Sequence, residues 1–111
     1  MRLTSEIFAS LLLRRVFSDG GFAAVERRGA AAAGAVFVLA RDRAGGLRLF
    51  GPAPQSLASE DGDRRFVEER VADAEGLRAR LAGEVRFDPD VWVVEIETEQ
   101  PETYLTIADA S

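Results

Sequence analysis

The sequence feature that most constrains the fold is the stretch of residues 87–97 (FDPDVWVVEIE), where an Asp-Pro-Asp turn leads directly into an apolar run. Side chains alternate between the two faces of a strand, so Trp92, Val94 and Ile96 share one face. The opposite face carries two valines followed by two glutamates: Val91, Val93, Glu95 and Glu97. We therefore expect a central strand whose Trp92 face lies in the core and whose other face is half exposed.

Residues 3–20 predict an N-terminal helix. Thr4 is a suitable N-cap, because its hydroxyl can accept a hydrogen bond from a free backbone amide in the first turn. Phe8, Leu12 and Val16 recur at i, i+4, and further apolar residues widen this stripe beyond one face. We therefore expect this helix to be mostly buried and the glycine pair at its end to terminate it.

A second, shorter helix is predicted for residues 73–86, directly before the Trp92 strand. Asp73 is its expected N-cap, and Leu77, Leu81 and Val85 form an apolar stripe at i, i+4, i+8. The helix has to end before Pro89, because the residue that precedes a proline is forced out of the helical region.

The remaining elements are predicted to be strands. Residues 35–41 (AVFVLAR) are apolar on both faces, which indicates a strand covered on both sides, one of them by the first helix. The loop 42–46 (DRAGG) joins this strand to a return strand at 47–51, which the two prolines of the GPAP segment stop because proline cannot donate to a ladder. Shorter strands are expected at residues 22–28, 65–71 and 103–107, with a loop at 29–34.

The 111 residues are enough for one compact domain with a single core. The elements indicate an α+β fold, in which the N-terminal helix packs on an antiparallel sheet of about five strands and a second short helix precedes the last long strand. We expect the acidic segment 56–63 (SLASEDGD) to be an exposed, mobile loop and residues 108–111 to fray.

The amino-acid composition removes several classes of chemistry. The chain has no cysteine and no histidine, and all fourteen of its basic residues are arginine. It therefore lacks a thiol nucleophile, the commonest general base and a Schiff-base lysine. We expect a protein that is not an enzyme, with no catalytic, cofactor-binding or metal-binding residues. With no visible signal peptide and no apolar stretch of about 20 residues, we expect it in the cytoplasm and without a membrane partner.

Two pairs of acidic residues lie near the two ends of the central strand, one in the turn before it and one in its last residues. Asp88 and Asp90, with Glu95 and Glu97 nearby, form the only dense carboxylate group, and hard cations take oxygen ligands. The spacing matches no metal-binding loop, whereas aspartates that flank a proline commonly fix a turn by hydrogen bonding to backbone amides. We prefer this structural interpretation, with the anchor formed by Asp88, Pro89, Asp90 and Trp92.

Several arginines are predicted to lie at strand ends and in hairpin loops, where they can meet on one edge of the sheet. We treat five of them as a candidate interaction or RNA-binding surface: Arg27, Arg28, Arg41, Arg43 and Arg48. An isoelectric point of about 4.8 argues against a polyanionic partner. Residues 1–65 carry ten arginines and seven acids, whereas residues 66–111 carry four and twelve. This asymmetry favours self-association, unless the two halves interleave in the fold and their fields cancel.

Six blocks of the sequence, in order, resemble one known family: MRLTSEIF (1–8), LLRR (12–15), RRG (27–29), AGAVFV (33–38), GPAP (51–54) and FDPDVWVVEIE (87–97). The chain is similar to family 1491 of the domains of unknown function, which are small alphaproteobacterial proteins. This resemblance implies a fold similar to that of Sm-like RNA-binding proteins, with an N-terminal helix on a strongly bent antiparallel sheet that forms a small barrel. An Sm core has only a very short link where residues 73–86 predict a helix. The family has no assigned activity, so the resemblance implies no catalytic residues, and likeness of fold alone does not carry function.

We interpret the chain as a cytoplasmic interaction or regulatory module that works by binding another protein or itself, which allows a homo-oligomer. The first alternative is an Sm-like RNA-binding protein, and the second is a carboxylate-dependent metal hydrolase.

Overall fold

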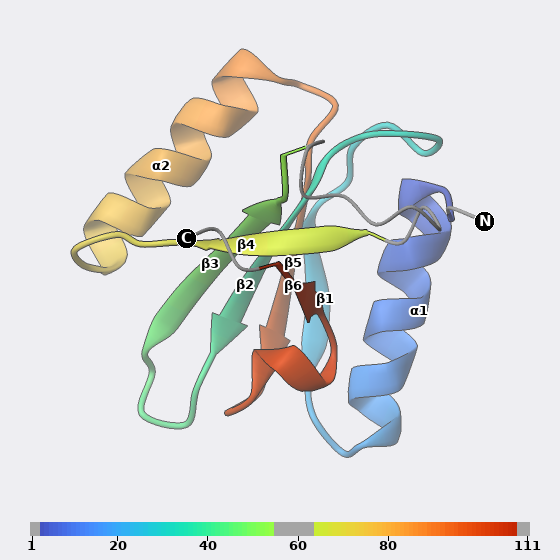
Figure 1. Cartoon of the computed structure of the whole chain (residues 1–111), viewed down its shortest axis with the longest axis vertical. Helices are drawn as coiled ribbons and strands as arrows, with labels where there is room; N and C mark the ends of the chain where they lie inside the picture. Colours follow the sequence, from blue (N-terminus) through green and yellow to red (C-terminus); the bar gives the residue numbers. More distant parts are fainter. Residues whose placement is uncertain (1–2, 55–63, 109–111) are drawn as a thin grey trace.

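The computed structural model describes residues 3–54 and 64–108, and it contains every helix and strand that the sequence predicts, with ends that differ by no more than three residues. Figure 1 shows the arrangement. In chain order the elements are α1 (Ser5–Ser18), β1 (Ala23–Arg27), β2 (Val36–Arg41), β3 (Leu47–Pro52), β4 (Arg65–Glu69), α2 (Ala74–Phe87), β5 (Trp92–Glu97), the 3-10 helix η2 (Pro101–Thr103) and β6 (Thr106–Ile107).

The six strands form one open, mixed sheet in the order β1-β5-β2-β3-β4-β6. β5 lies antiparallel to β1 and parallel to β2, and β6 lies parallel to β4. The expectation of about five antiparallel strands in an Sm-like small barrel is therefore wrong. Parallel neighbours need a crossover connection, and here the path from β2 through β3, β4 and α2 brings β5 back in the direction of β2. In Figure 1, β4 runs across the front of the other strands, so the sheet is strongly bent.

Local sequence signals explain where α1 begins and ends. The hydroxyl of Thr4 accepts a hydrogen bond from the Ile7 amide at 3.2 Å, as the N-cap prediction requires. The amides of Ser5 and Glu6 donate to the carbonyls of the loop that follows β1, which satisfies two more free groups of the first turn. Beyond the helix, Gly20 has a φ of 82°, a left-handed conformation that glycine adopts without steric cost.

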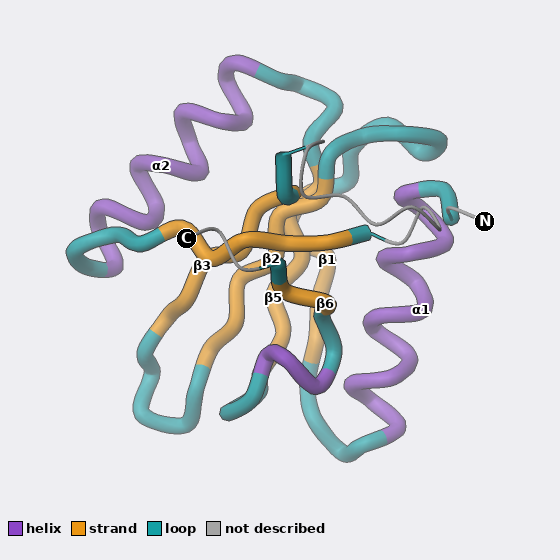
Figure 2. The backbone as a smooth tube through the Cα atoms, viewed as in Figure 1, coloured by secondary structure: helices purple, strands orange, loops and turns teal. Residues whose placement is uncertain are grey.

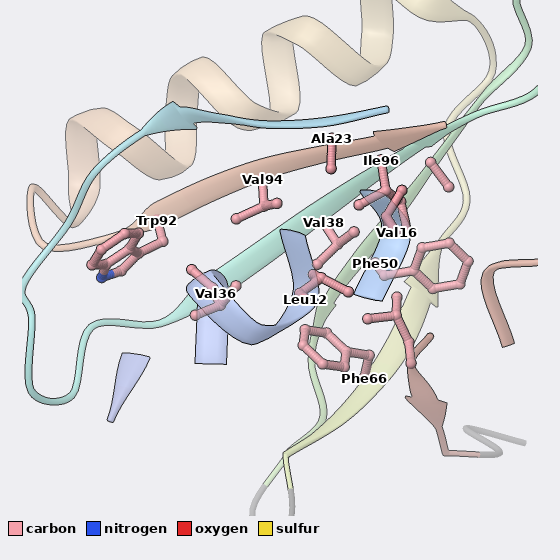
Figure 3. Close-up of a cluster of buried hydrophobic side chains, with 13 residues drawn as sticks. Leu12, Val16, Ala23, Val36, Val38, Phe50, Phe66, Trp92, Val94 and Ile96 are labelled. Carbon is pink, nitrogen blue, oxygen red and sulfur yellow. The ribbon is translucent and has the colours of Figure 1, made fainter. Parts of the chain in front are cut away.

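One hydrophobic core lies between α1 and the sheet. Figure 3 shows Leu12 and Val16 of α1 facing side chains of β2 and β5. Trp92, Val94 and Ile96 share this face of β5, as the alternation predicted. The buried members of this cluster are Ala9, Leu12, Val16, Ala23, Val36, Val38, Ala40, Phe50, Phe66, Trp92, Val94, Ile96 and Leu105.

A second, smaller core lies on the opposite face of the sheet, beneath α2. Asp73 caps this helix by accepting a hydrogen bond from the Gly76 amide at 2.7 Å. The helix buries its leucines against the sheet in a cluster of Phe37, Leu39, Leu49, Leu77, Leu81, Val91 and Val93. Figure 2 shows the two helices on opposite sides of the sheet. β2 is therefore covered on both faces, as predicted, and the second face of β5 becomes exposed only toward Glu97.

The predictions for the C-terminal tail and for the acidic segment can be compared with the structure only at Ala108. Ala108, the first residue of the predicted tail, is buried, and its amide donates to the Phe66 carbonyl at 2.7 Å. The predicted mobile loop at 56–63 and the rest of the predicted tail lie outside the described residues. Within the described ranges, neither helix is long and apolar enough to cross a membrane.

Candidate functional site

The five candidate arginines lie at separate places rather than along one track. Arg27 is in register with Val93 near the start of β5, whereas Arg41 is in register with Glu97 at its end. These positions are four strand residues apart, or about 13 Å along β5. The other three are placed as follows: Arg28 directly after β1, Arg43 in the hairpin loop after β2, and Arg48 in β3.

Arg41 and Arg48 each bind a glutamate of a neighbouring strand through two hydrogen bonds. Arg41 donates to Glu95 with both distances at 3.3 Å, and Arg48 donates to Glu68 at 2.9 and 2.8 Å. These hydrogen bonds hold the pKa of Glu95 and of Glu68 below the ordinary glutamate value. A phosphate group would have to displace a carboxylate from each arginine before it could bind there.

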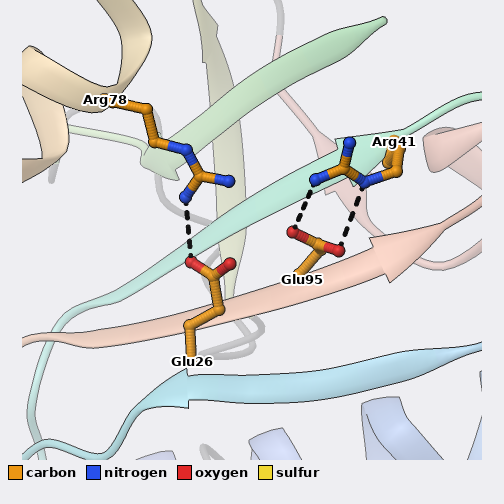
Figure 4. A network of polar contacts seen from close by, with 4 residues as sticks. All are labelled: Glu26, Arg41, Arg78 and Glu95. Carbon is orange, nitrogen blue, oxygen red and sulfur yellow. Dashed lines mark hydrogen bonds and ion pairs between the residues drawn. The ribbon is translucent and has the colours of Figure 1, made fainter. Parts of the chain in front are cut away.

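The pair of Arg41 and Glu95 belongs to a polar network on the α2 side of the sheet. Figure 4 shows Arg78 of α2 reaching Glu26 of β1, at 3.3 Å, beside the Arg41–Glu95 pair. Arg41 and Arg48 belong to the arginine-rich residues 1–65, and their glutamate partners belong to the acidic residues 66–111. In the pair of Arg78 and Glu26, the arginine comes from the second part and the glutamate from the first. The two halves of the chain therefore interleave, and their charges cancel locally.

These pairs predict a pH dependence of stability. The folded-state pKa of Glu68 and Glu95 is lowered, so their stabilisation is present above the unfolded-state pKa of about 4.3 and is lost as the pH falls toward the folded-state value. We expect the free energy of unfolding, measured by urea denaturation, to fall from about pH 5 downward. The matched variant Glu68→Gln/Glu95→Gln should lose less stability over the same range. Equal losses in both proteins would show that these two glutamates do not cause the effect.

The turn formed by Asp88, Pro89 and Asp90 is fixed by the end of β1 and by the loop that follows it. The amide of Asp90 donates to the Asp88 side chain at 3.0 Å. Arg27 donates to the Pro89 carbonyl and the Ala30 amide donates to the Asp90 carbonyl, each at 2.9 Å. The two aspartates thus lie before the start of β5, away from Glu97 at its other end, and the four carboxylates do not converge.

Trp92 lies beside this turn and is only 1% exposed. Its indole Nε1 donates to the Ala30 carbonyl at 2.8 Å. The guanidinium of Arg28 lies 5.0 Å from the centre of the ring and pairs with Glu6 in the first turn of α1. Arg27 and Arg28 therefore take part in packing at this end of the sheet.

A shallow depression with a volume of about 440 Å³ lies where β2 and β5 end. Tyr104 forms part of its wall and donates a hydrogen bond to Asp19 at 2.6 Å, which raises the pKa of the phenol. Arg43 also lines it, and the backbone amide of Arg43 donates to Glu99 at 2.7 Å. Within residues 3–54 and 64–108, no group of three or more acidic side chains is arranged to hold a metal ion. The lining therefore indicates no particular reaction.

The surface that the sequence analysis missed is the side of α1 that faces away from the sheet. We call the side chains of Ile7, Leu11 and Phe17, together with Leu3 just before the helix, the outer surface of α1; all four are exposed apolar residues. The expectation of a mostly buried helix is therefore wrong. Ile7 and Leu11 recur at i, i+4, next to the buried stripe rather than within it. This second stripe is the sequence signal that could have revealed the surface.

These features define a small α+β domain, in which a mixed, open sheet lies between two helices. The chain belongs to the family described as "Protein of unknown function (DUF1491)", whose model matches residues 3–106. The resemblance seen in the sequence is thus confirmed, and the family description assigns no activity.

Three solved structures are similar to the chain over nearly its whole length. The solution structure of protein Atu0922 from A. tumefaciens is 52% identical, with a TM-score of 0.85, and the match covers 100% of this chain and 98% of that one. A crystal structure of a DUF1491 family protein from Caulobacter crescentus CB15 is 36% identical, with a TM-score of 0.79 and coverage of 98% and 100%. An NMR structure of a DUF1491 family protein from the same organism is 37% identical, with a TM-score of 0.78, and the match covers 98% of this chain and 99% of that one. No curated protein matches the chain.

Proposed function

We propose that the protein is a cytoplasmic protein-binding module and that it binds its partner through the outer surface of α1. The observation that supports this proposal is the exposure of Ile7 and Leu11, at 48% and 41%, on a helix whose opposite face is buried. Contiguous apolar side chains surrounded by polar ones mark interaction sites on many proteins.

The fold does not require these apolar side chains. α1 is attached to the sheet through Ser5, Ala9, Leu12 and Val16, which are all buried. Burying a leucine or isoleucine completely contributes about 1.5–3 kcal/mol. A partner that covers the outer surface of α1 therefore gains this free energy on binding, because the isolated chain leaves these side chains exposed to solvent.

RNA binding has less support, because four of the five candidate arginines already donate to carboxylates or carbonyls: Arg27, Arg28, Arg41 and Arg48. We expect a titration with fluorescent single-stranded RNA to give no saturable binding at micromolar protein concentrations, even at about 50 mM salt. Binding at low salt that disappears at about 200 mM salt and in Arg27→Ala/Arg28→Ala would instead favour the RNA-binding alternative.

A metal hydrolase has the least support. Asp88 and Asp90 lie at one end of β5, and Glu95 is bound to Arg41. A hydrolytic pair of carboxylates needs a shared cleft, and the depression at the ends of β2 and β5 is lined by Glu97 but not by Asp88, Asp90 or Glu95.

The proposal is tested by affinity purification from the native host after nuclease treatment. We expect specific partner proteins to be recovered with the wild type and to be lost with Ile7→Glu/Leu11→Glu, because a charge in an apolar contact has to be desolvated. Both positions are exposed, so the variant should remain folded, and its circular dichroism and melting temperature check this.

Phe87→Glu is the matched control. Phe87 is 87% exposed at the end of α2, which lies on the other side of the sheet from α1 (Figure 2), so this variant also replaces an exposed apolar residue by a glutamate. It should keep every partner. Partners that survive the α1 substitutions, or that disappear with nuclease treatment, would contradict the proposal.

A further inference from the structure

The exposed residues along α1 form a pattern that is symmetric about Ser10. Ser10 and Phe17 are spaced seven residues apart, so they lie close to one line along the helix, and Leu3, seven residues before Ser10, directly precedes the N-cap Thr4. Glu6 and Arg14 lie four residues before and four residues after Ser10, near the same line. All five residues are exposed. An apolar residue therefore stands at the C-terminal end of this line and another just before the helix, with opposite charges between them and a small residue at the centre.

We infer that α1 packs against α1 of a second copy of this chain, antiparallel, with a two-fold axis at Ser10. This inference rests on the proposed function, since it names the partner of the same surface. A two-fold interface brings each residue level with the residue equally far on the other side of the axis. Phe17 then lies level with the segment that precedes α1 of the partner, which contains Leu3. The small side chain of Ser10 allows the two helices to approach to the usual 8–10 Å.

Charge complementarity favours a second copy of the chain as the partner, and it favours an antiparallel arrangement of the two helices. Arg14 forms no ion pair with any residue in the described ranges. Glu6 pairs with Arg28 but keeps 48% of its side chain exposed. The antiparallel arrangement sets Glu6 of each copy level with the partner's Arg14, which gives two attractive contacts. A parallel arrangement would set Arg14 against the partner's Arg14, and this like-charge contact would oppose it.

The size of the contact sets the strength of the dimer. One helix crossing buries less than the roughly 800 Å² per partner of a standard interface. The dimer is therefore weak and depends on protein concentration. Its two exposed charge pairs make it weaker as salt is added.

A single engineered cysteine tests the position of the axis, because the chain has no cysteine of its own. In Ser10→Cys the two thiols of a dimer face each other, and oxidised glutathione should convert the protein to a disulfide-linked dimer. Ser18→Cys is the matched control: it is exposed on the same helix, but the two copies of residue 18 lie about 24 Å apart in this arrangement. Equal rates of cross-linking for the two variants would overturn the inference.

Charge reversal tests the register independently. Sedimentation equilibrium of the wild type should show the average mass rising toward twice the chain mass as concentration increases. Glu6→Arg and Arg14→Glu should each remain monomeric, and the double variant should dimerise again. A wild type that stays monomeric at millimolar concentration, or a double variant that does not recover, would overturn the inference. A monomeric wild type that still loses its partners in Ile7→Glu/Leu11→Glu would leave the proposed function standing.

Discussion

Replacing Trp92 by alanine is expected to lower the free energy of unfolding by about 3–5 kcal/mol, as the removal of large core aromatics does. The ring is fully buried in the core under α1, and Trp92 is in register with Val36 of β2. Its loss leaves a cavity there. It also removes the donor that binds the Ala30 carbonyl and the ring on which Arg28 rests. Urea denaturation followed by circular dichroism measures the change, since the chain has no other tryptophan.

Phe87→Ala is the control for aromatic truncation. Phe87 is the most exposed large apolar residue among those described, at 87%, so its replacement should change the stability by less than about 0.5 kcal/mol. If Trp92→Ala cost no more than Phe87→Ala, the stretch around Trp92 would not organise the fold.

Adding one methyl group at Gly29 is expected to destabilise the protein by about 3 kcal/mol, at the upper end of what overpacking costs. A Cβ at this position would lie 2.0 Å from the Asp90 carbonyl oxygen and 2.7 Å from the carbonyl carbon of Val91. Both atoms belong to the backbone, so no side chain can turn away to relieve the clash. Gly34 meets the same Asp90 oxygen at 2.2 Å. These two glycines therefore allow the loop after β1 to pack directly on the turn before β5.

Gly83→Ala is the matched control for Gly29→Ala. Gly83 lies within α2, where an added Cβ meets nothing within 4 Å. Alanine is the better helix former by about 1 kcal/mol, so this variant should be more stable than the wild type. Thermal or urea unfolding of both variants gives the comparison. A Gly29→Ala protein as stable as the wild type would mean that the loop does not need the close contact with Asp90.

The features that were predicted correctly are those that depend on neighbouring residues. The caps at Thr4 and Asp73, the β2–β3 hairpin and the alternating faces around Trp92 all follow from local spacing and side-chain chemistry. The pairing of the strands within the sheet could not be predicted in this way. The parallel pairing of β5 with β2 depends on the path of the whole segment between them, including α2, and no local pattern encodes that path.

The surface chemistry could be predicted only in part, for the same reason. The arginines were identified from the sequence, but the carboxylates that bind Arg41 and Arg48 are 54 and 20 residues away along the chain. The outer surface of α1 was hidden because the helix is apolar on more than one side. Only the position of the sheet decides that Leu12 is buried while Leu11 is exposed.

The proposed role of the outer surface of α1 is tested most directly by photo-cross-linking in the native host. A photoreactive amino acid placed at Ile7 should give discrete protein adducts, and a product of twice the chain mass would identify the second copy. The same group placed at Arg48, on the arginine-bearing face of β3, should give none. Adducts at Arg48 but not at Ile7, or adducts that nuclease removes, would contradict the assignment of α1 as the binding surface.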